Sequence, residues 1–396
     1  MPKLFQINVT ANWGSHGKIA EDIGFLAQNE GWESYIAYGR SFNISSSNLI
    51  RIGGKKDVLI HAAQSMLFDK HGLASVNATK QLVRDIEDIQ PDIIQLHNIH
   101  GYYINYPILF EFLSKFKRPV VWTLHDCWPI TGHCAYFTYQ QCDKWKNGCY
   151  NCENKTEYPR RYLFDRSELN YSLKKKWFKS VDNLTLITVS DWLNGIIGES
   201  FLSDIKRLTI HNGINLNVFK KTDSYFKDYI DKRVVLGVCS FWDRRKGLSD
   251  IIKLRDYLDD SFIIILIGLS DKQKKILPAG IVGIERTNNV QELVSYYSRA
   301  DVFINTTYED NFPTTNLESL ACGTPVVTYR TGGSPEAIDD RTGITVDTGD
   351  IKCLAQAVYS ICDSSMFRLN CRKRAELLFD RNNCYKQYLQ LYKSLI

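Results

Sequence analysis

Short apolar runs and amphipathic stretches alternate along most of this 396-residue chain. Runs such as 119–124 (PVVWTL) and 261–268 (SFIIILIG) are rich in β-branched residues and have the length of buried strands. Between such runs, apolar residues recur near helical spacing, as Ile19, Ile23 and Leu26 do. Strands that are apolar at nearly every position and alternate with helices predict parallel sheets covered by helices, which is the doubly wound α/β class.

The chain is longer than one typical core requires, so we expect two domains of nearly equal size. A hydrophobic content of 44% and a charged content of 23% are those of a globular protein. A net charge of +5, without a recognisable nucleic-acid module, argues against a nucleic-acid partner. The first residues lack the features of a signal peptide and no apolar run is long enough to span a bilayer, so we expect a cytoplasmic location.

The stretch 301–336 combines two predicted strands, a helix and a glycine turn, and it carries two carboxylates. Asp310 precedes the predicted helix and Glu318 lies about one turn inside it, with Thr314 or Thr315 as the expected N-cap. In its apolar surroundings Glu318 could accept hydrogen bonds from sugar or ribose hydroxyls. The alternative is an ordinary βαβ unit with solvated acids, and spacing alone does not decide between the two.

Two glycine-containing turns are candidate ligand contacts. Gly332 and Gly333 would let backbone N–H groups approach a phosphate or a sugar closely. Gly14 and Ser15 follow the first predicted strand, at the edge of the sheet where doubly wound folds bind ligands. The alternative in both places is a plain turn.

A short basic segment opens a predicted helix in the second half of the chain. It contains Arg244, Arg245 and Lys246. A lysine at a helix entry can neutralise a diphosphate with help from the helix N-terminus. The alternative is three solvated basic residues.

His125 is the candidate for contact with reacting groups. It follows the run 119–124, at the carboxyl end of a predicted buried strand, where it could donate to or orient a hydroxyl. A lone histidine is more often structural, which is the alternative here.

Eleven cysteines occur in a chain without an export signal, so most should be free thiols. Four of them fall within nineteen residues of a turn-rich insert: Cys134, Cys142, Cys149 and Cys152. The last two have C-x-x-C spacing, so the four thiols predict a structural zinc site, in which His133 could replace one ligand. The alternatives are four reduced cysteines in an ordered loop, or disulfides that form only on oxidation.

The segment 155–179 is basic and aromatic, with eight Lys and Arg against three acids. A basic helix with apolar neighbours can lie on an anionic membrane surface. We therefore predict membrane contact through this segment; a solvated charged face is the alternative.

The stretch 301–336 resembles the signature of retaining glycosyltransferases of family 4. In that family an acid and a glutamate are separated by seven residues and followed by an ACGTPVV-like strand and a GG-x-PE turn, and this sequence has the same pattern. The first acid is Asp310 instead of the usual glutamate, and Phe312 fixes the alignment on Asp310 and not on Glu309. The cysteine insert narrows the resemblance to polysaccharide glycosyltransferases of the capsule and colanic-acid type.

The resemblance implies the GT-B fold, in which two doubly wound Rossmann-like domains face each other across a cleft. It implies an acceptor-side domain over 1–215, with a cysteine-rich insert over 127–155. A polar linker at 220–233 opens the nucleotide-sugar-binding domain over 216–375. We expect the C-terminal helix, 376–396, to pack back on the first domain.

The resemblance also implies a retaining enzyme that needs no catalytic metal. It would move a sugar from a nucleoside-diphosphate sugar to a glycan or lipid-linked glycan, in surface polysaccharide biosynthesis at the inner face of the cytoplasmic membrane. The donor phosphate would lie near Gly14 and Ser15, of which only Gly14 matches the Gly-Gly pair of the family.

Further residues carry over from the family by position. Lys246 would grip the diphosphate together with Arg244 or Arg245, because Phe241 occupies the position of the arginine that the family uses. His125 would contact the donor sugar or the acceptor.

The carboxylate pair carries over as well. Glu318 would hold the ribose of the nucleotide. Asp310 and the backbone near Asn311, Phe312 and Pro313 would bind donor hydroxyls. The sequence leaves two alternatives: a GT-B sugar-nucleotide epimerase or hydrolase, and a sugar-nucleotide-binding protein without catalysis.

Overall fold

The computed structural model describes residues 1–223, 229–364 and 366–396. It divides into two compact units, one formed by Met1–His211 with Tyr385–Ile396 and the other by Asn212–Cys384. The predicted division after residue 215 lies a few residues further along the chain. Residues 224–228 of the predicted linker lie outside the described ranges.

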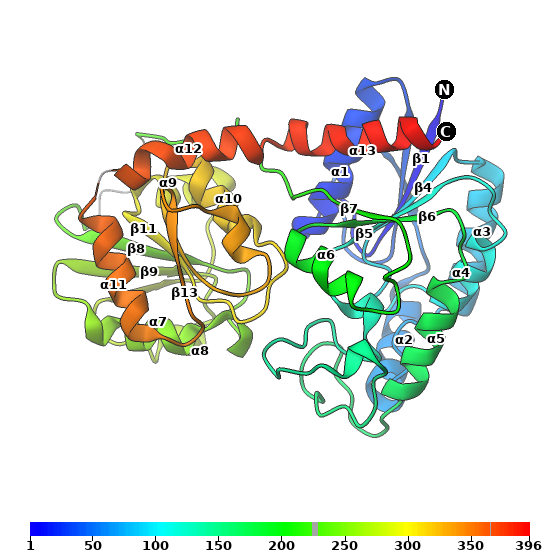
Figure 1. Cartoon of the computed structure of the whole chain (residues 1–396), viewed down its shortest axis with the longest axis horizontal. Coiled ribbons are helices and arrows are strands. Elements are labelled where there is room, and N and C mark those ends of the chain that lie inside the picture. The colour runs from blue at the N-terminus through cyan, green and yellow to red at the C-terminus, as the bar shows by residue number, and fades with distance from the viewer. Residues whose placement is uncertain (224–228, 365) are drawn as a thin grey trace. The chain divides into compact units, whose positions relative to one another are not determined.

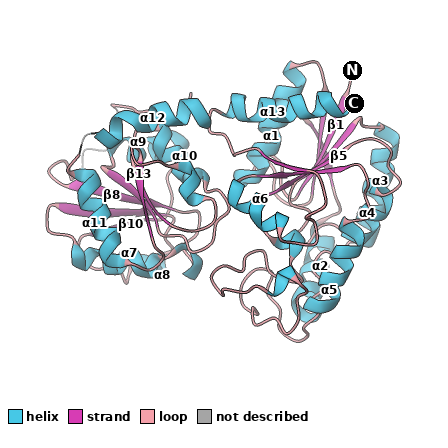
Figure 2. Cartoon of the chain, viewed as in Figure 1, coloured by secondary structure: helices cyan, strands magenta, loops and turns pink. Residues whose placement is uncertain are grey.

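The first unit contains a seven-stranded parallel sheet with the strand order β3-β2-β1-β4-β5-β6-β7. Figure 1 labels β1 and β4 to β7 of this sheet. Its strands are β1 (Lys3–Asn8), β2 (Glu33–Tyr38), β3 (Asn48–Arg51), β4 (Ile93–Leu96), β5 (Val120–Leu124), β6 (Leu184–Thr188) and β7 (Arg207–Thr209). Its helices are α1 (Gly14–Asn29), α2 (Lys55–Phe68), α3 (Val76–Ile89), α4 (Tyr106–Leu113), α5 (Ser167–Phe178) and α6 (Asp191–Gly198). The strands β4, β5 and β6 are buried at every position, as expected where helices cover both faces of a parallel sheet (Figure 2).

Side-chain caps set the starts of two of these helices. The side chain of Asn105, the N-cap residue of α4, accepts a hydrogen bond from the backbone N–H of Ile108. The side chain of Ser190 accepts from the N–H of Leu193 and begins α6. Between β5 and α5 the chain forms a long loop, in which the structure shows the short 3-10 helices η1 (Trp128–Ile130) and η2 (Lys144–Lys146).

The second unit contains a six-stranded parallel sheet with the strand order β10-β9-β8-β11-β12-β13. Its strands are β8 (Arg233–Val238), β9 (Phe262–Ile267), β10 (Ile281–Ile284), β11 (Val302–Asn305), β12 (Val326–Tyr329) and β13 (Gly343–Val346). Its helices are α7 (Leu248–Leu254), α8 (Asp271–Lys274), α9 (Val290–Arg299), α10 (Thr314–Ala321), α11 (Ile351–Cys362) and α12 (Met366–Leu378), with 3-10 helices η3 (Arg244–Lys246), η4 (Arg255–Tyr257) and η5 (Ser334–Ala337). The chain runs outward from β8 to β10 and then returns to β11 on the other side of β8. The switch point of the sheet, where such folds bind ligands, therefore lies between β8 and β11.

The C-terminal helix that was expected over 376–396 corresponds to α13 (Arg381–Leu395), which follows the end of α12 at Leu378. α13 begins in the second unit, and its residues from Tyr385 onward belong to the first. There the hydroxyl of Tyr392 donates to Oε1 of Gln95 at 2.9 Å, and Oγ1 of Thr123 donates to the hydroxyl oxygen of Tyr388 at 3.2 Å. The last residues therefore complete the core of the first unit. Over the described ranges, the structure contains no helix with both the length and the apolar content needed to cross a bilayer.

Candidate functional site

A cation and a carboxylate meet at the carboxyl ends of β8 and β11, the two strands of the switch point. Lys246 ends η3, and its Nζ lies 2.8 Å from Oδ2 of Asp310. Gly247 follows with φ 72°, and a Cβ at this position would lie 2.3 Å from the carbonyl oxygen of Thr306. A glycine is therefore required for this loop to pack against the end of β11.

Two cations, Lys246 and Arg245, act on the carboxylate of Asp310. Burial raises the pKa of Asp310, but the charges of Lys246 and then Arg245 outweigh it, so this pKa lies below its ordinary value. Nη1 of Arg245 donates at 2.7 Å to a backbone carbonyl of the loop that carries Asp310. Phe241 is 62% exposed, and Arg244 is exposed as well. Of the two predicted substitutes for the missing arginine, Arg245 is the one that the structure brings to Asp310.

The glycine turn supports the loop that carries Asp310. A Cβ at Gly332 would lie 1.7 Å from the carbonyl oxygen of Asp310, and the N–H of Gly333 donates to the carbonyl of Asn311 at 3.0 Å. Asn311 and Phe312 are 1% and 3% exposed. The turn thus packs against the loop that carries Asp310, and its approach to a phosphate or a sugar stays a prediction.

Glu318 lies in the second turn of α10 and accepts from the hydroxyl of Tyr297 at 2.9 Å. Tyr297, on α9, is fully buried, so its hydroxyl orients the carboxylate. The sequence did not reveal Tyr297, because a tyrosine within an apolar helical pattern is usually a core residue. The prediction that Thr314 or Thr315 caps α10 is wrong: the cap position is held by Pro313, without a side-chain hydrogen bond, because the helix already begins at Thr314.

His125 follows β5 and is partly exposed at the carboxyl edge of the first sheet. Its Nε2 lies 3.1 Å from Nδ1 of the buried His97, whose Nε2 lies 3.0 Å from Oε1 of Gln6. Burial, and next the neighbouring His97 and His16, lower the pKa of His125 well below its ordinary value. His125 is therefore a neutral imidazole that contacts a buried hydrogen-bonded chain.

A second polar chain lies beside the first. Oδ2 of Asp126 is 2.8 Å from Nε2 of His100, and Nδ1 of His100 is 2.9 Å from the hydroxyl oxygen of Tyr158. The other carboxylate oxygen of Asp126 accepts from the N–H of Trp128 at 2.9 Å. All eight histidines of the chain belong to the first unit, and several of them lie at this edge of its sheet.

Gly14 and Ser15 begin α1 after the N-cap residue Trp13, and both are exposed. Gly14 has φ 66°, so the turn between β1 and α1 favours a residue that tolerates the left-handed region. The ring of the next residue, His16, lies 6.0 Å from that of His125. The structure therefore brings the Gly14–Ser15 turn to the same edge of the first unit as His125.

The four predicted zinc ligands line one cavity of about 240 Å³ in the loop between β5 and α5. They are Cys134, Cys142, Cys149 and Cys152, all with free thiols. In the part of the chain that the structure describes, no three of these sulfur atoms lie within 4.8 Å of one another. The loop gathers the four side chains but does not arrange them as a closed tetrahedral set.

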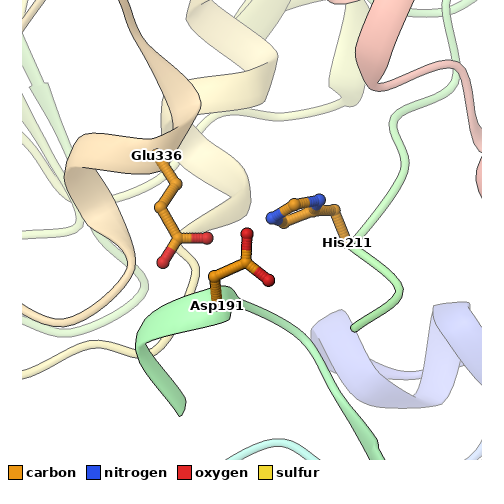
Figure 3. A group of neighbouring side chains, drawn as sticks. All are labelled: Asp191, His211 and Glu336. Atoms are coloured by element: carbon orange, nitrogen blue, oxygen red, sulfur yellow. The ribbon is translucent and has the colours of Figure 1, made fainter. Parts of the chain in front are cut away.

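Figure 3 shows Asp191, at the start of α6, beside His211, which follows β7. A carboxylate oxygen and a ring nitrogen of this pair lie within 4.8 Å of each other. Glu336, also drawn, belongs to η5 of the second unit. Within the first unit the pair offers two ligand atoms, fewer than protein metal sites use, so we assign no metal to it.

Two family models match the chain: one described as Glycosyltransferase Family 4, over residues 28–218, and one described as Glycosyl transferases group 1, over residues 232–364. The putative colanic acid biosynthesis glycosyl transferase WcaC of Escherichia coli (strain K12) is 23% identical over 423 residues, which cover 99% of this chain and 100% of that protein. The N,N'-diacetylbacillosaminyl-diphospho-undecaprenol alpha-1,3-N-acetylgalactosaminyltransferase of Campylobacter jejuni is 28% identical over 203 residues, or 46% of this chain and 53% of that protein. The crystal structure of Anabaena Alr3699/HepE in complex with UDP matches with a TM-score of 0.69 and 15% identity over 100% of both chains.

The two parallel α/β units have the GT-B fold, and both matching family models describe glycosyltransferases. The chain belongs to glycosyltransferase family 4, as the signature in 301–336 predicted. The relatives described above are named for glycosyl transfer, which favours this function over an epimerase, a hydrolase or a binding protein.

Proposed function

We propose that this chain is a retaining glycosyltransferase that moves a sugar from a nucleoside-diphosphate sugar to a glycan or lipid-linked glycan during surface polysaccharide biosynthesis. The observation that carries this proposal is the ion pair of Lys246 and Asp310 at the switch point, with Arg245 beside it. Two cations at that edge of a sheet suit a diphosphate. The UDP bound to HepE and the undecaprenol-linked substrate in the name of the Campylobacter relative support a nucleotide donor and a lipid-linked acceptor.

The ion pair suggests how a donor would enter. Without a donor, the carboxylate of Asp310 supplies the negative charge at Lys246. A diphosphate would take over that place, so that Asp310 and the backbone of 311–313 could bind hydroxyls of the donor sugar. Glu318, oriented by Tyr297, would accept from the ribose hydroxyls.

In the proposed reaction, the bond between the sugar C1 and the diphosphate oxygen breaks while the acceptor oxygen forms a bond to C1 on the same face. The acceptor proton passes to the departing diphosphate. Lys246 and Arg245 would stabilise the charge that develops there, which is the role of a metal ion in other enzymes, so the proposal includes no catalytic metal. His125 would orient the sugar and the acceptor.

Binding of nucleotide sugars is the first test, followed as the thermal shift of the purified chain with UDP-, GDP-, ADP- and CMP-sugars. One of them should raise the melting temperature, because a ligand that binds only the folded state stabilises it by about 2.7 kcal/mol at a hundred times its Kd. Glu318→Ala should remove most of this shift, whereas Asp256→Ala, at an exposed carboxylate of the same unit, should preserve it.

Three results would count against the proposal. A full shift in Glu318→Ala, or no shift with any of the four donors, would mean that the donor site is assigned wrongly. Release of the sugar to water without transfer to any glycan would favour the hydrolase.

We also propose that the first unit contacts the membrane surface through an apolar patch that α2 shares with the loop before α5. The patch consists of Leu59, Ile60, Leu67, Phe68, Tyr162, Leu163 and Phe164, each at least 40% exposed. The rings of Phe68 and Phe164 stack at 5.9 Å, and the N–H of Tyr162 donates to the carbonyl of Met66 at 2.8 Å, so the two segments form one surface.

Charge around the patch favours an anionic membrane as the partner. Lys55 and Lys56 stand one helical turn before Leu59 and Ile60, and both are exposed. The surface therefore extends beyond the predicted segment 155–179 to include α2, whose apolar face the sequence did not distinguish from a core face.

Replacing Leu59 and Phe164 together by serine should weaken binding to phosphatidylglycerol-containing vesicles by at least about tenfold, because each apolar side chain contributes about 1.5–3 kcal/mol when buried. Cosedimentation with vesicles measures this. Leu377→Ser, at a 78% exposed leucine of the second unit, is the matched control and should bind the vesicles as well as the wild-type protein does. Equal binding of all three proteins would contradict the patch.

The four cysteines are proposed to hold a structural zinc ion. The N–H of Gly132 donates to the sulfur of Cys149, a contact typical of the outer shell of thiolate sites. Lys174 is 1% exposed, and burial lowers its pKa to about 7. The neighbouring Cys149 and Cys134 act in the opposite direction and raise this pKa. A zinc ion with four thiolates carries two negative charges and would offset this buried ammonium. The thiols must rotate inward to reach the tetrahedral distances.

Metal analysis of the purified chain should then find about one zinc per chain, with a lower melting temperature after treatment with a chelator. The double variant Cys149→Ser, Cys152→Ser should lose the metal and its response to the chelator. Cys353→Ser, at an exposed cysteine of the second unit, should retain both. A chain purified without zinc, and with a melting temperature that added zinc does not change, would contradict this proposal.

A further inference from the structure

The hydrogen bonds behind His125 determine which of its ring nitrogens carries the proton. Gln6 is fully buried on β1, and its Nε2 donates to the carbonyl of Ala20 at 2.8 Å. A carbonyl only accepts, so the amide nitrogen must point there and Oε1 faces Nε2 of His97, 3.0 Å away. An amide oxygen also only accepts, so Nε2 of His97 carries a hydrogen.

The same reasoning extends from His97 to His125. His97 is 1% exposed, and burial together with His16 lowers its pKa to about 3, so the ring is neutral near pH 7. A neutral imidazole has one N–H, which leaves Nδ1 of His97 as an acceptor. Nε2 of His125, 3.1 Å from that acceptor, must therefore be the donor. The two rings are nearly parallel, with an interplanar angle of 20°.

We infer that Gln6 and His97 are positioning residues that hold His125 as its Nε2-protonated tautomer, so that Nδ1 of His125 accepts a hydrogen bond from a sugar hydroxyl. This inference rests on the proposed function, in which His125 contacts the donor sugar or the acceptor. A hydroxyl can donate to Nδ1, whereas a carboxylate or phosphate oxygen would bring one lone pair against another. The group bound at His125 is then a hydroxyl of the sugar and not a carboxylate.

Position 97 allows a matched pair of substitutions. The backbone of His97 is fixed independently of its side chain, because its N–H donates to Ile7 and its carbonyl accepts from Nε1 of Trp122, both at 2.9 Å. In His97→Asn, the amide oxygen can lie where Nδ1 was and still accept from His125. In His97→Gln, the amide lies where Nε2 was, so the acceptor for His125 is lost.

Nitrogen NMR of the chain labelled at histidine reads the tautomers directly, with His125→Asn to identify the signal of His125. We expect His125 to be protonated at Nε2 in the unchanged chain and in His97→Asn, and to be a mixture of tautomers in His97→Gln. In transfer assays, kcat of His97→Gln should fall by about tenfold with the donor KM within about twofold, and kcat of His97→Asn should stay within about threefold. Gln6→Met, which removes the acceptor for His97 but keeps both histidines, provides the same test if His97→Gln does not fold.

An Nδ1-protonated His125 in the unchanged chain would overturn the inference, and so would equal kcat values for the two His97 variants. The NMR measurement does not depend on turnover. If the protein neither binds nor transfers a nucleotide sugar, the proposed function fails. The tautomer of His125 still shows whether Gln6 and His97 hold its proton on Nε2.

Discussion

Lys246→Met is expected to lower kcat/KM for the nucleotide-sugar donor by about 10²- to 10³-fold, the usual effect of removing one preorganised group that stabilises developing charge. The ammonium of Lys246 lies at the switch point of the second sheet, with a side chain that is 18% exposed. Methionine preserves the length of the side chain but cannot neutralise a departing diphosphate. Steady-state transfer assays with varied donor measure the effect.

Loss of Lys246 also leaves the carboxylate of Asp310 without its closest cation, which could unfold the loop for reasons unrelated to catalysis. The double variant Lys246→Met, Asp310→Asn removes that unpaired charge and should be as inactive as the single variant. Lys253→Met, at an exposed lysine of α7, should retain full activity. A kcat/KM for Lys246→Met within about threefold of the unchanged value would show that this lysine does not bind the diphosphate.

Lowering the pH from 7.5 to 5 is expected to destabilise the first unit by several kcal/mol. Burial lowers the pKa of His16 and His61 to about 4 and that of His97 to about 3, and it holds those of His71 and His125 well below the ordinary value. Between these values and about 6.5, the unfolded chain binds protons that the folded chain does not. Stability therefore falls as the pH falls, by up to about 2 kcal/mol for each histidine at pH 5.

Tryptophan fluorescence during urea unfolding can follow this loss. The first unit contains Trp13, Trp32, Trp122, Trp128, Trp145, Trp177 and Trp192, and the second contains Trp242. The urea midpoint should decrease from pH 7.5 through pH 6 to pH 5. The second unit has no histidine in its sequence, so nucleotide-sugar binding at low urea should be less sensitive to this change. An equal midpoint at all three pH values would contradict the assignment of neutral buried histidines.

Local sequence was sufficient to predict most of the elements that carry the candidate site. The stretch 301–336 forms β11, α10 and β12 as its apolar periodicity indicated, because neighbouring residues alone determine that periodicity. Lys246 was identified from its position at the entry of a predicted helix, and Asp310 as the acid that precedes the predicted helix of 301–336. Their ion pair was not predicted, because it depends on β8 and β11 lying side by side. That strand pairing joins segments that are far apart in the sequence.

Residues that support the site from inside the protein could not be predicted. Gln6 and His97 lie in or next to buried strands, and Tyr297 lies on an amphipathic helix, where a polar residue gives no indication of its partner. The hydrogen bonds they form depend on the rotamers of side chains that meet only in the folded state. The C-x-x-C spacing led us to expect that the four cysteines lie together, and they line one cavity, but spacing alone could not predict the distances between their sulfur atoms, which depend on side-chain rotamers.

Residues 385–396 belong to the first unit, so this unit cannot complete its core on the ribosome until they have been synthesised. Tyr388 and Tyr392 fill the core of the first unit and contact Thr123 and Gln95, so a nascent chain that ends at His211 exposes this surface. The second unit, which is contiguous from Asn212 to Cys384, can complete its core before the first unit can. The half that is made first is therefore finished last, and it is the half that nascent-chain chaperones must protect until residues 385–396 have left the ribosome.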